Sequence, residues 1–101
     1  MLVVAGTIEF DPADQEAVVA VAQQASIATR AEVGCISYEF FADLAGNGRL
    51  HVFEEWEEER HLLAHFETPH FVAYAAELEA IGLRSRDITR YYVSSHGPNR
   101  S

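Results

Sequence analysis

The order of apolar and polar positions divides the chain into short strands and amphipathic helices. Residues 2–10 are rich in valine and isoleucine and acquire polar side chains late, which predicts a strand. The Asp11-Pro12 pair that follows is typical of a helix start, with Asp11 as the N-cap. We expect this helix to extend to about Ala31, with an apolar stripe made of Ala13, Ala17, Val18, Val21, Ala25 and Ala28.

Similar signals divide the rest of the chain. Gly34 marks the end of the first helix, and Asn47-Gly48 supplies a hairpin turn that tolerates positive φ. Thr68-Pro69 starts a further helix, which Gly82 closes. The expected elements are, in order, strands at 35–43 and 49–57, helices at 57–66 and 69–81, and a fourth strand at 88–94, followed by a flexible C-terminal tail at 95–101.

This β-α-β-β-α-α-β order predicts a ferredoxin-like α+β sandwich with an antiparallel four-stranded sheet, in one domain at residues 1–94. The helices cover one face of such a sheet. The other face is not polar, because Val52 and Phe53 are expected on opposite faces of their strand and both are apolar. Ile36, Tyr38 and Phe40 are expected to share one face of the neighbouring strand. We therefore expect a second copy of the chain to cover the open face, which makes the protein a homodimer.

Charge and composition exclude several classes of partner. The chain has 101 residues and a formal net charge of −9, so it lacks the basic face that binds nucleic acid or anionic membranes. Its apolar runs are too short for a transmembrane helix, and residues 1–10 lack the features of a signal peptide. Cys35 is the single cysteine, which favours the cytoplasm, and it is expected to be a small core residue.

Three histidines gather at the break between the last two helices. His61 and His65 are one turn apart and are placed to share a metal ion with Glu57 or Glu58. The spacing is not HExxH, and paired histidines are common on surface helices, so we expect no metal site. His65 and His70 are instead the candidate catalytic bases, although a hydrogen bond from His65 to a backbone carbonyl would explain the residue equally simply.

Glu54 is a carboxylate on an apolar face, because it alternates with Val52 and Trp56. A buried carboxylate needs a partner, and Arg90 or Arg60 is the expected one. A catalytic carboxylate is the alternative.

Aromatic residues predict a ligand pocket beside these groups. The residues expected to bind a planar aromatic substrate are Trp56, Tyr38, Tyr74, Phe53 and Phe66, together with Glu54. The sequence contains no P-loop, no GxGxxG before a helix, no GxSxG and no CxxC, so we expect neither a nucleotide nor a flavin, and no cofactor at all.

An ordered set of short motifs resembles the antibiotic biosynthesis monooxygenase (ABM) family over about residues 2–93. The motifs are Gly34-Cys35, Tyr38-Glu39, Glu54-x-Trp56, Leu63-x-His65 and Pro69-His70-Phe71. The resemblance implies a dimeric α+β barrel, formed by two sheets that pack face to face. It also implies one of the family's activities, which include cofactor-free oxygenation of anthrones or quinols, haem degradation and isomerisation of a small sugar-derived signal.

Departures from the family pattern narrow these activities. The resemblance places the haem-ligating histidine of haem-degrading relatives at Ala75 and their asparagine near Gly6. Because this chain has neither side chain there, haem is disfavoured. Trp56 resembles the pocket tryptophan of anthrone-oxidising relatives, but their asparagine falls near Val52.

The resulting hypothesis is a cofactor-independent monooxygenase that oxidises a small quinol, anthrone or related phenol with molecular oxygen. His65 is the expected base, with His70 as its substitute; Trp56 and Tyr74 position the ring, and Tyr38 donates a hydrogen bond. A non-catalytic dimer that holds a small aromatic molecule, as a binding or stress-response protein, is one alternative. An isomerase that uses the same pocket is another.

Overall fold

Four antiparallel strands form one sheet in the computed structural model, which describes residues 1–100. The sheet order is β2-β3-β1-β4, which is the ferredoxin-like arrangement predicted from the sequence. The strands are β1 (Leu2–Phe10), β2 (Cys35–Ala42), β3 (Arg49–Trp56) and β4 (Leu83–Tyr92).

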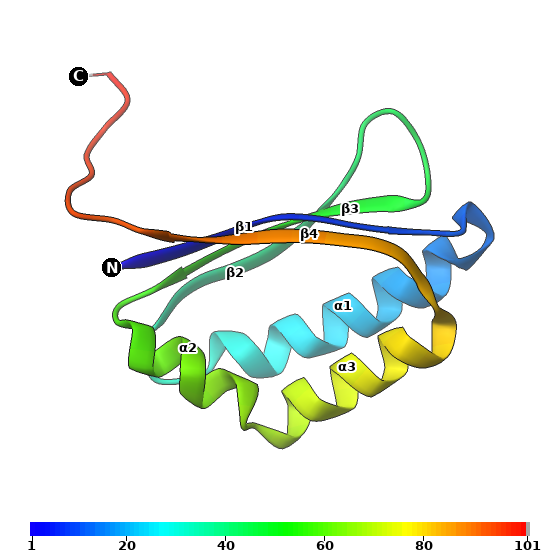
Figure 1. Cartoon of the computed structure of the whole chain (residues 1–101), viewed down its shortest axis with the longest axis horizontal. Coiled ribbons are helices and arrows are strands. Elements are labelled where there is room, and N and C mark those ends of the chain that lie inside the picture. The colour runs from blue at the N-terminus through cyan, green and yellow to red at the C-terminus, as the bar shows by residue number, and fades with distance from the viewer. Residues whose placement is uncertain (101) are drawn as a thin grey trace.

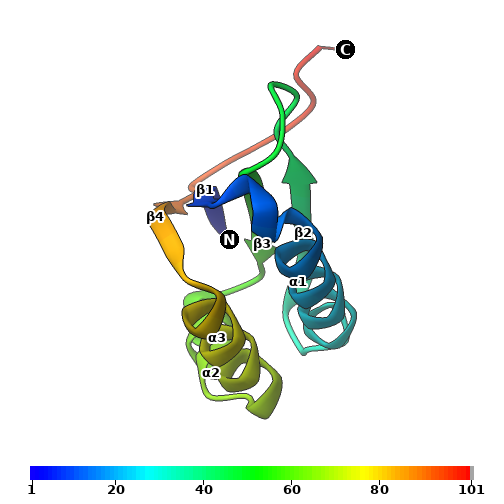
Figure 2. The ribbon, with the colours of Figure 1, turned by 90° about the vertical axis from the view of Figure 1, so that its right-hand side faces the viewer.

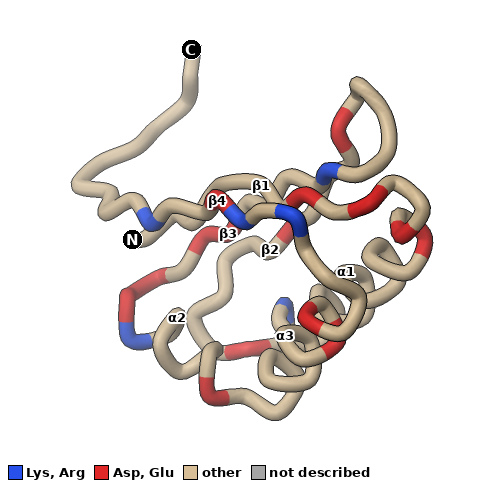
Figure 3. The backbone as a smooth tube through the Cα atoms, turned by 45° about the vertical axis from the view of Figure 1, so that its right-hand side comes forward, with Lys and Arg blue, Asp and Glu red and all other residues tan. Residues whose placement is uncertain are grey.

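All helices lie on one face of this sheet (Figures 1 and 2). They are a short 3-10 turn η1 (Pro12–Asp14), α1 (Gln15–Arg30), α2 (Glu59–Phe66) and α3 (Pro69–Ile81). No helix within residues 1–100 is long and apolar enough to cross a membrane. Figure 3 shows acidic positions distributed over the sheet, the helices and the hairpin loop, in keeping with the charge of −9.

Side-chain caps fix the helix starts where the sequence predicts them. Asp11 accepts a hydrogen bond from the Ala13 amide at 2.9 Å, and Thr68 Oγ1 accepts one from the Phe71 amide at 3.2 Å. At the end of α3, Gly82 has φ 96°, a conformation that disfavours residues with a Cβ atom. In the hairpin, positive φ falls on Gly46 and Gly48 and not on Asn47.

The buried face of α1 differs from the predicted stripe. Ala13 and Ala17 are exposed, because the chain first makes the 3-10 turn η1 and this turn changes the rotation of the residues that follow. The buried residues are Val18, Ala22, Ala25, Ser26 and Thr29. Ser26 tolerates burial because its hydroxyl donates to the carbonyl of Ala22 at 2.7 Å.

The strands depart from the sequence prediction at two places. β4 begins at Leu83, five residues earlier than predicted, because an edge strand can present charged side chains such as Arg84 to solvent. β2 contains a bulge: Cys35 pairs with Trp56 and Ser37 with Glu55, so the register skips Ile36. Ile36 is therefore 51% exposed and does not share the buried face of Tyr38.

The core lies between the sheet and the helices in two clusters. One consists of Ile8, Phe10, Val18, Ala22, Leu50 and Leu78, toward the start of α1 and the end of α3. The other consists of Leu2, Val4, Tyr38, Trp56 and Leu62, and Cys35 packs against it as a small core residue. Burial raises the pKa of the Cys35 thiol to about 11, so the thiol is protonated at neutral pH.

The sheet face opposite the helices carries exposed aromatic side chains. Phe53 pairs with Ala5 and Glu39 on this face and is 37% exposed. Phe41 and Tyr91 lie on the same face and are 54% and 53% exposed. The alternation predicted for β3 is thus confirmed. Residues 93–100 contain no helix or strand, and the last residue of the predicted tail, Ser101, lies outside the described residues.

Candidate active site

A cavity of about 230 Å³ lies between the helix-facing side of the sheet and helices α2 and α3. Its wall is mostly apolar and aromatic, with a few polar groups: Val4, Tyr38, Phe40, Val52, Glu54, Leu62, His65, Phe66, Phe71, Tyr74, Ala75, Arg86 and Ile88. Two larger hollows of about 520 and 560 Å³ flank α1, but they are more open than this cavity, and neither is lined by a buried histidine or carboxylate. The smaller cavity therefore has the composition of a ligand site.

His65 is the buried base in this cavity. It lies in the last turn of α2, and only 2% of its surface is exposed. The rings of Phe71 and Trp56 pack against the imidazole at centroid distances of 4.9 and 5.1 Å. Burial lowers the pKa of His65 below its usual value, so the ring is neutral at pH 7 and can accept a proton.

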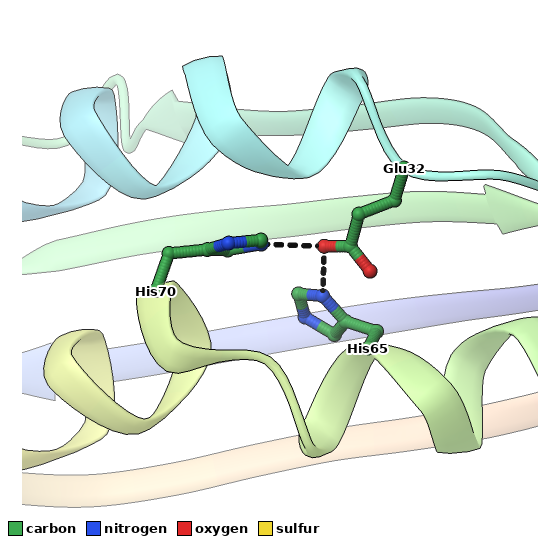
Figure 4. A group of neighbouring side chains, drawn as sticks. All are labelled: Glu32, His65 and His70. Atoms are coloured by element: carbon green, nitrogen blue, oxygen red, sulfur yellow. Dashed lines mark hydrogen bonds and ion pairs between the residues drawn. The ribbon is translucent and has the colours of Figure 1, made fainter.

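Glu32 fixes the tautomer of His65. The Oε2 atom of Glu32 lies 2.7 Å from Nδ1 of His65, so Nδ1 carries the proton and donates it to the carboxylate (Figure 4). The other ring nitrogen, Nε2, is then the one available to a molecule in the cavity. The bond also opposes the effect of burial, because the carboxylate raises the pKa of His65. This arrangement replaces the backbone-carbonyl partner that the sequence suggested.

His70 reaches the same carboxylate from the first turn of α3. Its Nε2 lies 2.6 Å from Oε2 of Glu32, so one oxygen accepts hydrogen bonds from two imidazoles (Figure 4). His70 does not line the cavity; it borders the groove between α1 and α3. It is therefore a partner of Glu32 and a less direct candidate base than His65.

Glu54 is the second buried ionisable group of the cavity. Trp56 donates its indole N–H to Glu54 Oε1 at 3.0 Å, and the glutamate is 8% exposed. Burial raises the pKa of Glu54 to about 7, against the opposing effect of the hydrogen bond from Trp56. The arginines expected to pair with Glu54 are engaged elsewhere: Arg90 binds Glu59 at 3.2 Å and Arg60 binds Glu58 at 2.7 Å.

Two phenols and one arginine complete the polar lining. Burial raises the pKa of Tyr74 to about 12 and raises the pKa of Tyr38 still further, so both hydroxyls remain protonated at neutral pH and can donate hydrogen bonds. Arg86 contributes a positive charge from β4 at the edge of the sheet. The cavity thus contains a neutral base, hydrogen-bond donors and a cation within an apolar wall.

The sequence matches a known family over most of its length. A model of the family described as antibiotic biosynthesis monooxygenase matches residues 1–77. The chain belongs to this family. Membership supports a general monooxygenase-like function. The uncharacterized protein sll1783 of Synechocystis is 31% identical over 93 residues. The aligned region covers 92% of this chain and 63% of the length of that relative.

Solved structures share the ABM fold across nearly the whole chain. A candidate antibiotic biosynthesis monooxygenase of Deinococcus radiodurans superposes with a TM-score of 0.92 at 21% identity and covers 100% of both chains. Rv0793 of Mycobacterium tuberculosis has a TM-score of 0.86 at 26% identity and covers 96% of this chain and 98% of that one. PA3566 of Pseudomonas aeruginosa has a TM-score of 0.84 at 26% identity, with coverage of 93% and 94%.

The structure brings most of the predicted site residues of this ABM protein to one place. Those that line the cavity are His65, Glu54, Tyr38, Tyr74 and Phe66. Trp56 is fully buried behind the wall, where it donates a hydrogen bond to Glu54 and packs against His65. Phe53 is a correction: it lies on the opposite face of the sheet and does not border this cavity, because successive residues of a strand alternate between faces.

The histidine pair considered for a metal ion does not form. The ring of His61 packs against Gly34, where an added Cβ would lie 2.1 Å from the imidazole, and its Nδ1 is buried without a hydrogen-bond partner within residues 1–100. His65 faces Glu32 instead of His61.

Sequence reasoning missed Glu32, Arg86 and Ile88. Glu32 lies in the connection between α1 and β2, where no periodic pattern indicates which side chains point inward. Arg86 lies in the part of β4 that the sequence analysis left outside a strand, and Ile88 is the first residue of the strand predicted there. Ala75 and Val52 also line the cavity and contribute to its apolar wall.

Proposed function

We propose that this ABM protein is a cofactor-independent monooxygenase that oxidises a small quinol or related phenol with molecular oxygen. The observation that carries the proposal is the Glu32–His65 pair at the wall of an apolar cavity. A neutral imidazole that is oriented by a carboxylate is a general base, and a phenol is an acid of the right strength for it.

The chemistry begins when Nε2 of His65 accepts a proton from the bound quinol, while its Nδ1–H remains bonded to Glu32. The resulting phenolate transfers one electron to O₂, and the two radicals combine to form a carbon–oxygen bond. The hydroperoxide then loses water. The balance is one quinol plus one O₂ giving one hydroxyquinone plus one H₂O, so the substrate supplies all the electrons that reduce oxygen.

The lining residues support this sequence of steps. The protonated hydroxyls of Tyr38 and Tyr74 and the charge of Arg86 are placed to stabilise the phenolate as it forms. Phe66 and its neighbours provide an aromatic wall that excludes water. The volume of about 230 Å³ is below the range of about 300–1,000 Å³ of drug-sized ligand pockets, which favours a substrate of one or two rings over a larger anthrone.

A homodimer is part of the proposal. Phe41, Phe53 and Tyr91 expose aromatic surface on the sheet face that the helices leave open. Packing two such faces together would bury this surface, and it would place the two cavities on the outer sides of a double sheet. The single cysteine is consistent with the reducing cytoplasm as the site of action.

Oxygen uptake with menadiol tests the proposed reaction. The purified protein is expected to accelerate oxygen consumption well above the rate of spontaneous oxidation and to yield a hydroxylated quinone with one ¹⁸O atom from ¹⁸O₂. Binding of menadiol without accelerated uptake would contradict the oxygenase and favour the non-catalytic binding protein.

Glu54 supports isomerisation as a second candidate. A carboxyl group with a pKa of about 7 can return a proton that His65 has removed, and acid–base pairs of this kind move hydrogen between neighbouring carbons. Exchange of substrate protons with deuterium from D₂O, in the absence of oxygen uptake, would favour this activity over oxygenation.

A further inference from the structure

Glu32, His65 and His70 bring one carboxylate oxygen and two imidazole nitrogens to a single point (Figure 4). The three donor atoms lie within 4.8 Å of one another, although the residues come from the α1–β2 connection, α2 and α3. Two histidine nitrogens and a carboxylate oxygen form the donor set that first-row divalent metal ions prefer, zinc in particular.

We propose that these three residues form a binding site for a divalent transition-metal ion such as Zn²⁺. Ligands about 2.0–2.2 Å from zinc in a tetrahedral site lie about 3.3 Å apart. Glu32 Oε2 lies 2.7 Å from His65 Nδ1 and 2.6 Å from His70 Nε2, so each of these two pairs needs to separate by roughly 0.6–0.7 Å to hold the ion. Three protein ligands leave the fourth position open to water.

The charge and burial of the three residues favour a bound metal ion. Within residues 1–100, Glu32 pairs with no arginine, so its negative charge is shared only between two imidazoles. The side chain of Glu32 is 13% exposed and that of His65 is 2% exposed, which limits competition from water. The side chain of His70 is 29% exposed in the first turn of α3. A metal ion can therefore reach the site from solvent, and the His70 ring has room to move into coordinating distance.

His65 links this site to the proposed monooxygenase activity, and this part of the inference rests on that proposed function. A metal ion at Nδ1 uses the lone pair of that nitrogen, so the proton of the neutral ring moves to Nε2. Nε2 is the nitrogen that the cavity needs as a base, and with a proton attached it can only donate. Metal binding is therefore expected to inhibit oxidation of the quinol.

Calorimetric titration of the chelator-treated full chain with ZnCl₂ tests the site without any substrate. One Zn²⁺ per chain is expected to bind with micromolar or stronger affinity, and Co²⁺ in its place should give the visible absorption of a four-coordinate site. His70→Ala and Glu32→Gln should each weaken binding by about tenfold or more, because each removes one of three ligands.

Two other histidines provide matched controls. His51 forms a partly exposed pair with Asp43 at 2.8 Å, and His61 lies one turn before His65 on α2. His51→Ala and His61→Ala should bind Zn²⁺ as the unchanged protein does. Absence of Zn²⁺ binding would overturn the site, and so would an affinity in His70→Ala and Glu32→Gln equal to that of the unchanged protein. His70 is partly exposed, so its replacement is expected to preserve the fold, which circular dichroism checks.

Oxygen uptake separates the two parts of the inference. If the protein oxidises menadiol, saturating Zn²⁺ should abolish the uptake and EDTA should restore it. Full activity in the presence of bound Zn²⁺ would contradict the proposed move of the His65 proton from Nδ1 to Nε2. If the protein binds Zn²⁺ as expected but oxidises no quinol, the metal site stands and the proposed oxygenase fails.

Discussion

Glu54 and Trp56 are two residues apart on β3, point to the same face of the sheet and share a hydrogen bond from the indole Nε1 to the carboxyl Oε1 at 3.0 Å. The bond satisfies the one donor of a fully buried tryptophan and gives the carboxyl a single neutral partner. One neutral hydrogen bond does not offset the burial of a charge, and for this reason the pKa of Glu54 rises to about 7.

The raised pKa predicts how stability depends on pH. Between the usual pKa of 4.5 and the folded value of about 7, the folded protein binds more protons at Glu54 than the unfolded chain does. The stabilisation that this proton provides is therefore present at low pH and is lost as pH rises through that window. Glu54→Gln keeps the acceptor for Trp56 and removes the charge, so it should stabilise the protein above pH 7 by up to roughly 3 kcal/mol.

Urea unfolding at pH 5 and pH 8, at fixed protein concentration, measures this difference. The variant and the unchanged protein should differ more at pH 8 than at pH 5. A constant difference between the two pH values would show that Glu54 has an ordinary pKa.

His65→Ala is expected to lower the turnover of quinol by roughly 10²- to 10⁴-fold, because it removes the general base. The variant also leaves a small gap among Tyr38, Trp56 and Phe71, so its fold must be checked by thermal unfolding. His51→Ala is the matched control, since His51 lies near the hairpin and bonds Asp43. Unchanged turnover in His65→Ala, with a loss in His70→Ala, would assign the base to His70.

Glu32→Gln should weaken the base without removing it. The carboxylate raises the pKa of His65 against the effect of burial, so its loss moves the acid limb of the kcat/KM profile to lower pH. A hydrogen bond to a charged group is worth about 1.5–3 kcal/mol, which corresponds to roughly 10- to 100-fold in rate. The profile is measured with EDTA present. A uniform loss of activity with an unmoved acid limb would indicate a structural role only.

Phe53→Glu tests the dimer through the open face of the sheet. The unchanged protein should have twice the chain mass of 11.3 kDa by light scattering, and the variant should dissociate, with loss of stability. Ile27→Glu is the control, because Ile27 is 73% exposed on α1, away from that face. A monomeric unchanged protein at micromolar concentration would refute the dimer.

Local signals were sufficient to predict most of the fold. The caps at Asp11 and Thr68 and the alternation along β3 are properties of neighbouring residues, and the structure has them where they were expected. The bulge at Ile36 was not predictable, because it depends on how β2 pairs with β3. The early start of β4 was missed because charged residues there mask a strand that is stabilised by pairing with β1.

In the candidate site, too, local patterns predicted some residues and could not predict others. Tyr38, Glu54 and Trp56 were predictable because alternation along a strand assigns them to one face. The contact of Glu32 with His65 joins residues 33 positions apart, and it depends on how the end of α1 packs against α2. No pattern within either segment reports that packing.

The interruption between α2 and α3 has a consequence for rotation about a helix axis. In a continuous helix, side chains five residues apart differ in direction by about 140°, so His65 and His70 would face different sides of one cylinder. The chain instead leaves the helix after Phe66 and restarts at Pro69, with Thr68 as the new cap. This reset turns both imidazoles toward the same oxygen of Glu32. A substitution that let the two helices merge would therefore add helical hydrogen bonds and at the same time separate the two rings.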